Sequence, residues 1–193
     1  MSYGHISWGL GNVIWSFYNF VLHQEVPYPS FADLGFALAV PLWAIGVFYL
    51  SKATGAKYGL KKKTGQLYLF FIPIVTFILS YYSLVTIARG GSITSGGGLL
   101  KIFFDFAYPI GDVLITTIAL LIYGLSLKYL GGRYKWPVLI TLFGFVVMFF
   151  ADFTFSYTTT INTYFNGSLA DLLFTTALSI MGVGIASFDT KEG

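Results

Sequence analysis

The chain has 193 residues, of which 56% are hydrophobic and only 10% are charged. An ordinary soluble domain carries roughly a quarter charged residues, so these few charges could not cover a soluble fold of this size. There is no cysteine, which excludes disulfides, thiolate chemistry and Cys-ligated metals. The net charge of +3 is gathered in short loops, which indicates membrane topology and not a nucleic-acid partner. The composition therefore predicts an integral membrane protein surrounded by a lipid bilayer.

The stretches between charged residues predict six transmembrane helices, because a membrane-crossing helix needs about 20 apolar residues. We expect the fourth stretch to extend upstream through Ala107 and the fifth to continue past Asp152. The predicted fold is an all-α, polytopic membrane helix bundle that forms a single transmembrane domain over residues 1–193. In chain order, the uncharged stretches cover residues 6–22, 34–51, 64–88, 113–127, 136–151 and 172–188.

The loops predict the sidedness of the bundle. The loop at 52–63 carries five lysines, and the loop at 128–135 carries Lys128, Arg133 and Lys135. Both are expected to be cytoplasmic, because basic residues favour that side of the membrane. The intervening loops hold only Arg89 and Lys101 as basic residues. We therefore expect a multi-pass protein of the cell membrane with both termini in the cytoplasm.

Three aspartates precede even-numbered helices, namely Asp33, Asp112 and Asp171. A carboxylate at a helix N-terminus accepts hydrogen bonds from free N–H groups and complements the helix dipole. In a three-hairpin bundle the three residues would lie near the outer face, where an acidic cluster would attract cations. Three independent N-caps are the alternative interpretation.

The first and last helix pairs resemble each other. Residues 30–46 and 168–184 share seven identities in 17 positions, including Asp33 with Asp171. On the preceding helices, Asn12 corresponds to Asp152. The simplest account is three helical hairpins running in the same direction, at approximately 6–53, 64–128 and 136–189, as in parallel-repeat membrane proteins. The alternative is that helices starting at an interface simply look alike, and the middle copy is the weakest.

The chain also resembles a family, through the runs WGLGNVIW at residues 8–15, VPYPSFAD at 26–33 and NGSLADL at 166–172. These runs are similar to the N-terminal multi-helix membrane sensory domains found ahead of diguanylate cyclase and phosphodiesterase modules in bacterial signalling proteins. The family's acidic residue in the first helix is Asn12 here, and no output domain follows. The resemblance implies a stand-alone membrane sensory or ligand-binding module.

Asp152 is the strongest candidate for a ligand, proton or ion site, because ionisable groups inside a bilayer are costly and face the protein interior. We expect it to face Asn12 across the core, close to Tyr81, Tyr82 and Ser83. A purely structural hydrogen bond between helices is the alternative. The two histidines, His5 and His23, stand at opposite ends of the first helix, so no metal or cofactor is expected.

No sequence pattern indicates an enzyme, because nothing matches a catalytic dyad, a protease motif or a phosphate-binding loop. The preferred function is a non-enzymatic sensory or ligand-binding module that acts through a separate cytoplasmic signalling partner. A small-solute or cation transporter or channel, or an accessory subunit of a larger membrane complex, are the alternatives. The sequence leaves the ligand and the oligomeric state open.

Overall fold

The fold is known from a computed structural model, which describes residues 1–93, 98–126, 128–131 and 134–188. Arg133, the glycines at 96–97 and residue 189 at the end of the last predicted hairpin lie outside these residues. The described residues form helices and no strand, which confirms the all-α prediction. The elements are α1 (Ser2–Phe20), α2 (Phe31–Ala53), α3 (Ala56–Leu60), α4 (Lys63–Ser80), the π-helix η1 (Tyr81–Ile87), α5 (Leu99–Ser126), α6 (Lys135–Thr160) and α7 (Leu169–Ala186).

Five helices are long and apolar enough to cross a membrane, which supports a multi-pass membrane protein in contact with lipid. They are α2, α4 continued by η1, α5, α6 and α7. The helix α1 has 19 residues and no charged side chain, but it is not among them. Its length corresponds to about 28 Å at 1.5 Å per residue, close to the ~30 Å of a bilayer core. What separates it from the other five is its content of serine, glycine, asparagine and histidine.

The fourth and fifth spans extend beyond the uncharged stretches that predicted them. The fourth span begins at Leu99 and not near Asp112, so Asp112 lies inside α5 and not at its N-terminus. The apolar run Phe103, Phe104 and Phe106 extends the helix upstream, and Pro109 lies inside the helix without ending it. The fifth span continues past Asp152 to Thr160, as predicted.

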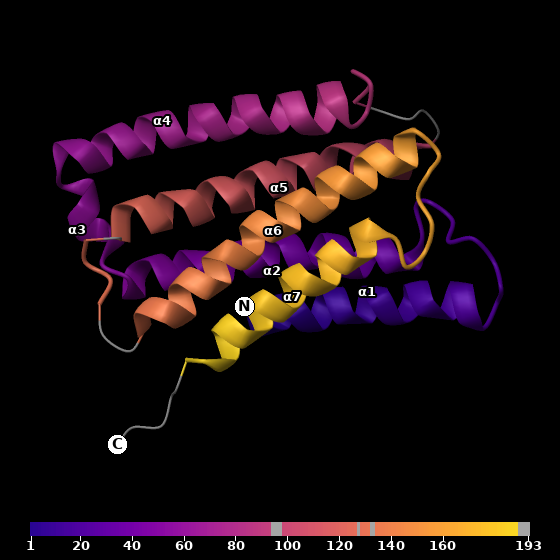
Figure 1. The fold of residues 1–193 in the computed structure, drawn as a ribbon, viewed down its shortest axis with the longest axis horizontal. Helices are drawn as coiled ribbons and strands as arrows, with labels where there is room; N and C mark the ends of the chain where they lie inside the picture. The colour runs from indigo at the N-terminus through magenta and orange to yellow at the C-terminus, as the bar shows by residue number, and fades with distance from the viewer. Residues whose placement is uncertain (94–97, 127, 132–133, 189–193) are drawn as a thin grey trace.

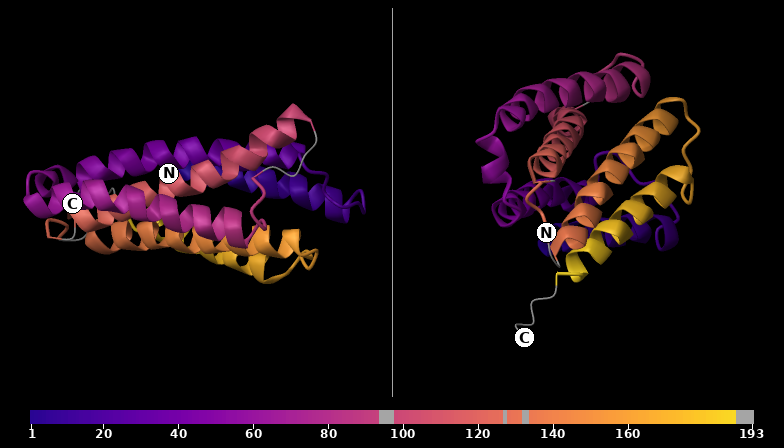
Figure 2. Two further views of the ribbon diagram at one scale, coloured as in Figure 1. Left: turned by 90° about the horizontal axis from the view of Figure 1, so that it is seen from above. Right: turned by 60° about the vertical axis from the view of Figure 1, so that its left-hand side comes forward.

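The helices pack as consecutive pairs: α1 against α2, α4 against α5, and α6 against α7. α5 also contacts α2 and α6, so the middle pair is docked on the other two through α5. The connections alternate between the two ends of the bundle (Figures 1 and 2). The lysine-rich connections around α3 and between α5 and α6 lie at one end, and the other connections lie at the opposite end.

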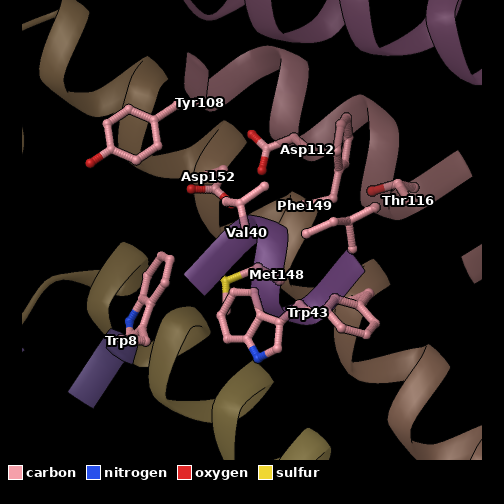
Figure 3. A pocket seen from close by; sticks show the side chains of 11 residues that line it. Trp8, Val40, Trp43, Tyr108, Asp112, Thr116, Met148, Phe149 and Asp152 are labelled. Carbon is pink, nitrogen blue, oxygen red and sulfur yellow. The ribbon is translucent and has the colours of Figure 1, made fainter. Parts of the chain in front are cut away.

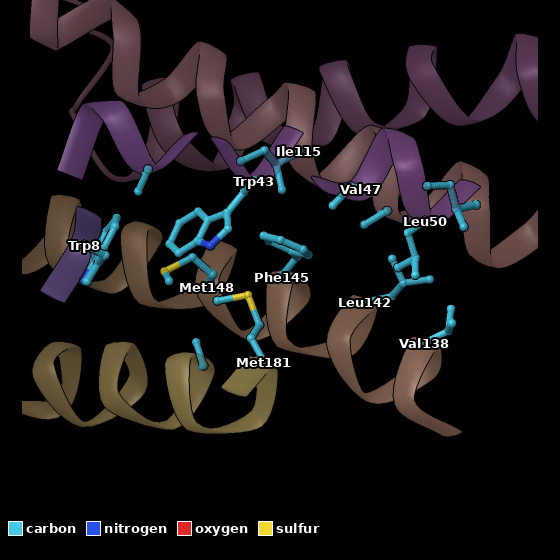
Figure 4. Close-up of a cluster of buried hydrophobic side chains, with 14 residues drawn as sticks. Trp8, Trp43, Val47, Leu50, Ile115, Val138, Leu142, Phe145, Met148 and Met181 are labelled. Carbon is cyan, nitrogen blue, oxygen red and sulfur yellow. The ribbon is translucent and has the colours of Figure 1, made fainter. Parts of the chain in front are cut away.

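The apolar core lies between α1, α2, α5, α6 and α7 (Figure 4). Its centre is formed by Trp43 and Phe145, whose rings meet edge to face at 5.8 Å, and by the fully buried Met181. Trp8 stacks on Trp43 at 5.4 Å. α4 contributes nothing to this cluster, so its described side chains face mainly outward.

Glycine allows the tightest helix contacts. A Cβ at Gly184 on α7 would lie 2.7 Å from the backbone nitrogen of Thr141 and 3.0 Å from the carbonyl oxygen of Pro137, both on α6. A Cβ at Gly35 on α2 would lie 2.7 Å from the backbone nitrogen of Gly11 on α1. Small residues let membrane helices approach closely enough for van der Waals packing, so these contacts fix two of the three helix pairs.

We expect Gly184→Ala to destabilise the bundle, because backbone atoms of α6 cannot move aside as a flexible side chain would. The cost is on the order of 1–3 kcal/mol, as for other overpacked interiors. Gly182→Ala on the same helix is the matched control, since a Cβ there meets nothing within 4 Å. Thermal denaturation of both variants in detergent measures the difference. Equal melting temperatures would contradict the packing described for α6 and α7.

Candidate functional site

Two carboxyl groups meet inside the bundle. Asp112 lies in the middle of α5 and Asp152 lies in the C-terminal half of α6, and their side chains share a hydrogen bond. Their side chains point toward each other between the two helices (Figure 3). An ionised carboxylate has no proton to donate, so a hydrogen bond between two carboxyl groups requires a proton on one of them. In this arrangement the pair therefore carries at least one proton, within two membrane-spanning helices.

A tyrosine beside this pair is bonded to the N-terminal end of α2. The hydroxyl of Tyr108 donates to Asp33 Oδ1 at 2.7 Å, and Tyr108 lies one helical turn before Asp112 on α5. The other oxygen of Asp33 accepts from the backbone nitrogen of Ser30 at 2.6 Å and from its hydroxyl at 3.1 Å. Polar groups thus run from the helix end to the carboxyl pair.

Arg89 supplies the positive charge near the site. It lies two residues after the end of η1, and its Nη1 donates to the carbonyl oxygen of Asp105 at 2.8 Å. Its guanidinium attracts both carboxyl groups of the pair electrostatically. The Asp105 side chain accepts from the hydroxyl of Tyr28 at 3.0 Å. Burial, followed by the hydrogen bond to Asp105, raises the pKa of Tyr28, so this loop tyrosine remains a donor.

A small cavity lies beside the carboxyl pair, with a volume of about 20 Å³. A space of roughly 10–15 Å³ or more on this measure holds one water molecule. The cavity therefore suits a proton exchange site, a water or a small ion, and is too small for an organic ligand. Its walls are largely aromatic and apolar, and are formed by Trp8, Val40, Trp43, Tyr108, Asp112, Ile115, Thr116, Phe145, Met148, Phe149 and Asp152 (Figure 3).

The predicted neighbours of Asp152 lie elsewhere. Asn12 is exposed on the outside of α1, so the prediction that it faces Asp152 across the core is wrong. Tyr81 and Tyr82 are 50% and 58% exposed, and the Ser83 hydroxyl donates to the carbonyl oxygen of Leu79 at 2.7 Å. The apolar stretch at 64–88 gave no sign of which face of the helix would point inward, and these two tyrosines point outward.

The three predicted acidic residues divide between two roles. Asp33 and Asp171 each complete a capping box, with Ser30 and Ser168 respectively, and Asp171 also accepts from the hydroxyl of Tyr164 at 3.0 Å. Asp112 caps no helix and pairs with Asp152. Local capping thus accounts for Asp33 and Asp171, although Asp33 is joined to the site through Tyr108.

The site residues that were not predicted from the sequence are Tyr108, Arg89, Trp8 and Trp43. One signal was present: Asp105, Tyr108 and Asp112 are spaced three and four residues apart, which places them on one face of a helix. Neither histidine lines the cavity: His5 Nδ1 accepts from Trp43 Nε1 at 3.1 Å behind the cavity wall, and His23 is exposed in the connection between α1 and α2. Within the described part of the chain, no group of three or more His, Cys, Asp or Glu side chains could hold a metal ion.

Comparison with protein-family models, with curated proteins and with solved structures finds no match. The function is therefore inferred from the chemistry of the site.

Two substitutions at Asp152 separate hydrogen bonding from packing. Asp152→Asn keeps a group that can donate to the Asp112 carboxylate, so we expect a stability close to that of the natural chain. Asp152→Leu leaves Asp112 without its partner, at a cost of about 1–3 kcal/mol for a buried polar group. Thermal denaturation in the same detergent gives the comparison. If Asp152→Asn is as damaging as Asp152→Leu, the paired hydrogen bond is not what the site requires.

Proposed function

We propose that this chain is a six-span, non-enzymatic membrane sensory module, in which the Asp112–Asp152 pair binds a proton or a small cation. The observation that carries the proposal is the hydrogen bond between two carboxyl groups inside membrane-spanning helices. Ionisable residues at such positions are costly to insert and usually mark proton or ion sites. The small adjoining cavity favours an ion-sized ligand, and the resemblance to bacterial membrane sensory domains supports a signalling role.

The chemistry of the pair gives a simple switch. With one proton, the two groups attract each other through a hydrogen bond. When that proton leaves, two negative charges face each other in a medium of low dielectric constant and repel strongly. A small cation would replace the proton by bridging the same oxygens. Gain or loss of the bound ion therefore changes the contact between α5 and α6.

The response would reach the cytoplasm through the basic end of the bundle. α5 and α6 are consecutive; Lys128 lies in the connection between them, and Lys135 is the first residue of α6. Lys57, Lys61 and Lys62 lie around α3 at the same end. A movement between α5 and α6 would rearrange this basic surface, to which an acidic face of a separate signalling protein would bind.

The sixth span in this proposal is α1, and contacts support its equivalence to α6. When Asn12 is aligned with Asp152, and Asp33 with Asp171, α1 and α6 end at corresponding residues and α2 and α7 begin at corresponding residues. Both second helices start with a Ser–Asp capping box. The helix ends of the first and last hairpins therefore correspond, and only the loops that join the two helices of each hairpin differ slightly in length.

Contacts inside the two hairpins also correspond. A Cβ at Gly4 would meet the Trp43 ring, and a Cβ at the counterpart Gly144 would meet Met181, the counterpart of Trp43. In the same way, a Cβ at Gly46 would meet Met1, and a Cβ at its counterpart Gly184 would meet Thr141, the counterpart of Met1. A ring contact of 6.4 Å between Trp15 and Phe36 has its counterpart in one of 6.1 Å between Phe155 and Phe174. Shared apolar composition does not explain matched partners, so these contacts support an internal repeat.

The proton site is testable by infrared difference spectroscopy on the protein in lipid nanodiscs. Carboxylic acid and carboxylate groups absorb at different frequencies, so a pH step should change the carboxylic acid band. We expect Asp112→Asn, Asp152→Asn and the double variant to remove this change. Fluorescence of Trp8 and Trp43, which line the cavity, should follow the same pH dependence. Asp171→Asn is the control, since that capping carboxylate lies outside the pair. A natural chain whose carboxyl bands ignore pH, sodium and potassium would contradict the proposal.

A proton or cation transporter is the second candidate, because the same carboxyl pair would serve as a transport site. Ion flux in sealed proteoliposomes separates the two functions. Flux that depends on Asp112 and Asp152 supports transport, whereas ion-dependent spectral changes without flux support sensing. Retention of a cytoplasmic signalling protein through the lysines around α3 would further support sensing.

Sidedness can be measured directly because the chain has no cysteine. We expect Ser2→Cys and Lys61→Cys to react with an impermeant maleimide only from the cytoplasmic side, and Thr163→Cys only from outside. All three positions are exposed. If α1 does not cross the membrane, Ser2→Cys will react from the same side as Thr163→Cys, and the six-span arrangement fails.

A further inference from the structure

The matched hairpins have two corresponding helix seams, here called grooves: α5 covers the seam between α2 and α6, and no described helix covers the seam between α1 and α7. α5 contacts both α2 and α6 and so occupies the groove between them. Across that groove Phe145 of α6 touches Trp43 of α2. His5 of α1 is the counterpart of Phe145, and its Nε2 lies 3.3 Å from the carbonyl oxygen of Leu178 on α7. The groove between α1 and α7 is therefore the counterpart of the groove that holds α5.

The lining of the open groove is small and polar. Phe149 and Asp152 of α6 line the cavity beside α5, and their counterparts on α1 are Gly9 and Asn12. Both counterparts are exposed, and a Cβ at Gly9 would meet nothing within 4 Å. The stripe on α1, spaced three and four residues apart as in a helix–helix seam, consists of Ser2, His5, Gly9, Asn12 and Ser16.

α7 contributes a matching stripe beside Leu178. Thr175 and Ser179 are exposed, and a Cβ at Gly182 would meet nothing within 4 Å. Thr175 and Gly182 lie about one turn before and after Leu178, the residue whose carbonyl oxygen lies near His5. The two stripes thus flank the line along which α1 and α7 approach each other.

The opposite side of the bundle shows what a lipid-facing surface of this protein looks like. α4 lies away from α1 and α7 (Figures 1 and 2). Its exposed side chains are large and apolar, among them Phe70, Phe77 and Ile78. Membrane helices place small and hydrogen-bonding residues against other helices, because lipid offers an amide no partner. The groove between α1 and α7 therefore has the chemistry of a helix interface.

We propose that a second copy of this chain occupies this groove, with the α1 of each protomer packed along the α1 and α7 of the other. Asn12 favours a copy over a different partner, because an amide both donates and accepts and so pairs with an identical amide. A twofold axis along the membrane normal brings identical residues together at the same depth. Gly9 then lets the two α1 helices approach closely. The proposal rests on the hairpin repeat but does not depend on the ion site.

The test is cross-linking in vesicles of phosphatidylcholine and phosphatidylglycerol at a low protein-to-lipid ratio. Ser16→Cys, which keeps Asn12, should form a disulfide-linked dimer on oxidation, with no background because the chain lacks cysteine. Ile78→Cys on α4 is the matched control and should remain monomeric. If Ile78→Cys cross-links as well as Ser16→Cys, or if neither does, the proposed interface is wrong.

Disruption gives the second measurement. Asn12→Leu and Gly9→Leu should each weaken dimerisation by about tenfold or more, measured by energy transfer between labelled protomers. The first removes the amide pair, and the second adds a side chain that keeps the two α1 helices apart. Neither side chain is packed within its own protomer, so the melting temperature measured under monomeric conditions in detergent should stay the same. A natural chain that remains monomeric in vesicles overturns the proposal, whatever the outcome of the pH experiments.

Discussion

The constraint that shapes this molecule is that a polar group inside the bilayer finds no water and must find its partner in the protein. Several threonine hydroxyls meet this need within their own helices. Thr141, Thr154 and Thr175 each donate to the carbonyl oxygen four residues earlier, at 2.8–2.9 Å. Two carboxyl groups cannot be satisfied in this way. Asp112 and Asp152 meet because each offers the other a hydrogen-bond partner that lipid cannot, and this contact requires a proton on at least one of the two groups.

The position of the site follows from the way in which the hairpins pack. Glycine brings α1 against α2 and α6 against α7, and α5 fills the groove between α2 and α6. Asp112 on α5 therefore meets the face of α6 that carries Asp152. The π-helix η1 then ends next to Arg89, whose charge acts on both carboxyl groups. π-helical turns are frequent at functional sites, and here one precedes the cation whose charge acts on the acidic pair.

The comparison of Asn12 with Asp152 shows how one sequence position acquires two roles. In the internal repeat that we propose, the two residues occupy corresponding positions in the first and last hairpins. On α6 that position faces α5 and a cavity, whereas on α1 it faces outward. A carboxyl group is tolerated where a second carboxyl group can share a proton with it. An amide suits a surface where the partner is another helix, because it carries no charge and can both donate and accept.

Much of the architecture could be derived from the residues alone. Lipid admits long apolar helices, so the spacing of charges located α2, α4, α6 and α7, and the Ser–Asp spacing located the caps at Asp33 and Asp171. Asp152 was singled out because charge inside an apolar span is rare. The partner of Asp152 was misassigned, since Asn12 and Tyr81 were as plausible as Asp112 when only the depth along each helix was known. The start of α5 was also missed, because Lys101 and Asp105 interrupt the uncharged stretch while Arg89 and Tyr28 satisfy polar groups of that segment in the folded chain.

By itself, the sequence determined that the helices suit lipid and not water, the number and rough length of most helices, and the grouping of the basic loops. These features depend on composition and on local hydrogen bonding. Only the tertiary structure decided which faces of those helices meet. Rotation of a helix about its axis changes neither its length nor its hydropathy. It does change which side chains touch, and so determines that Asp152 shares its proton with Asp112 while Asn12 is left facing outward.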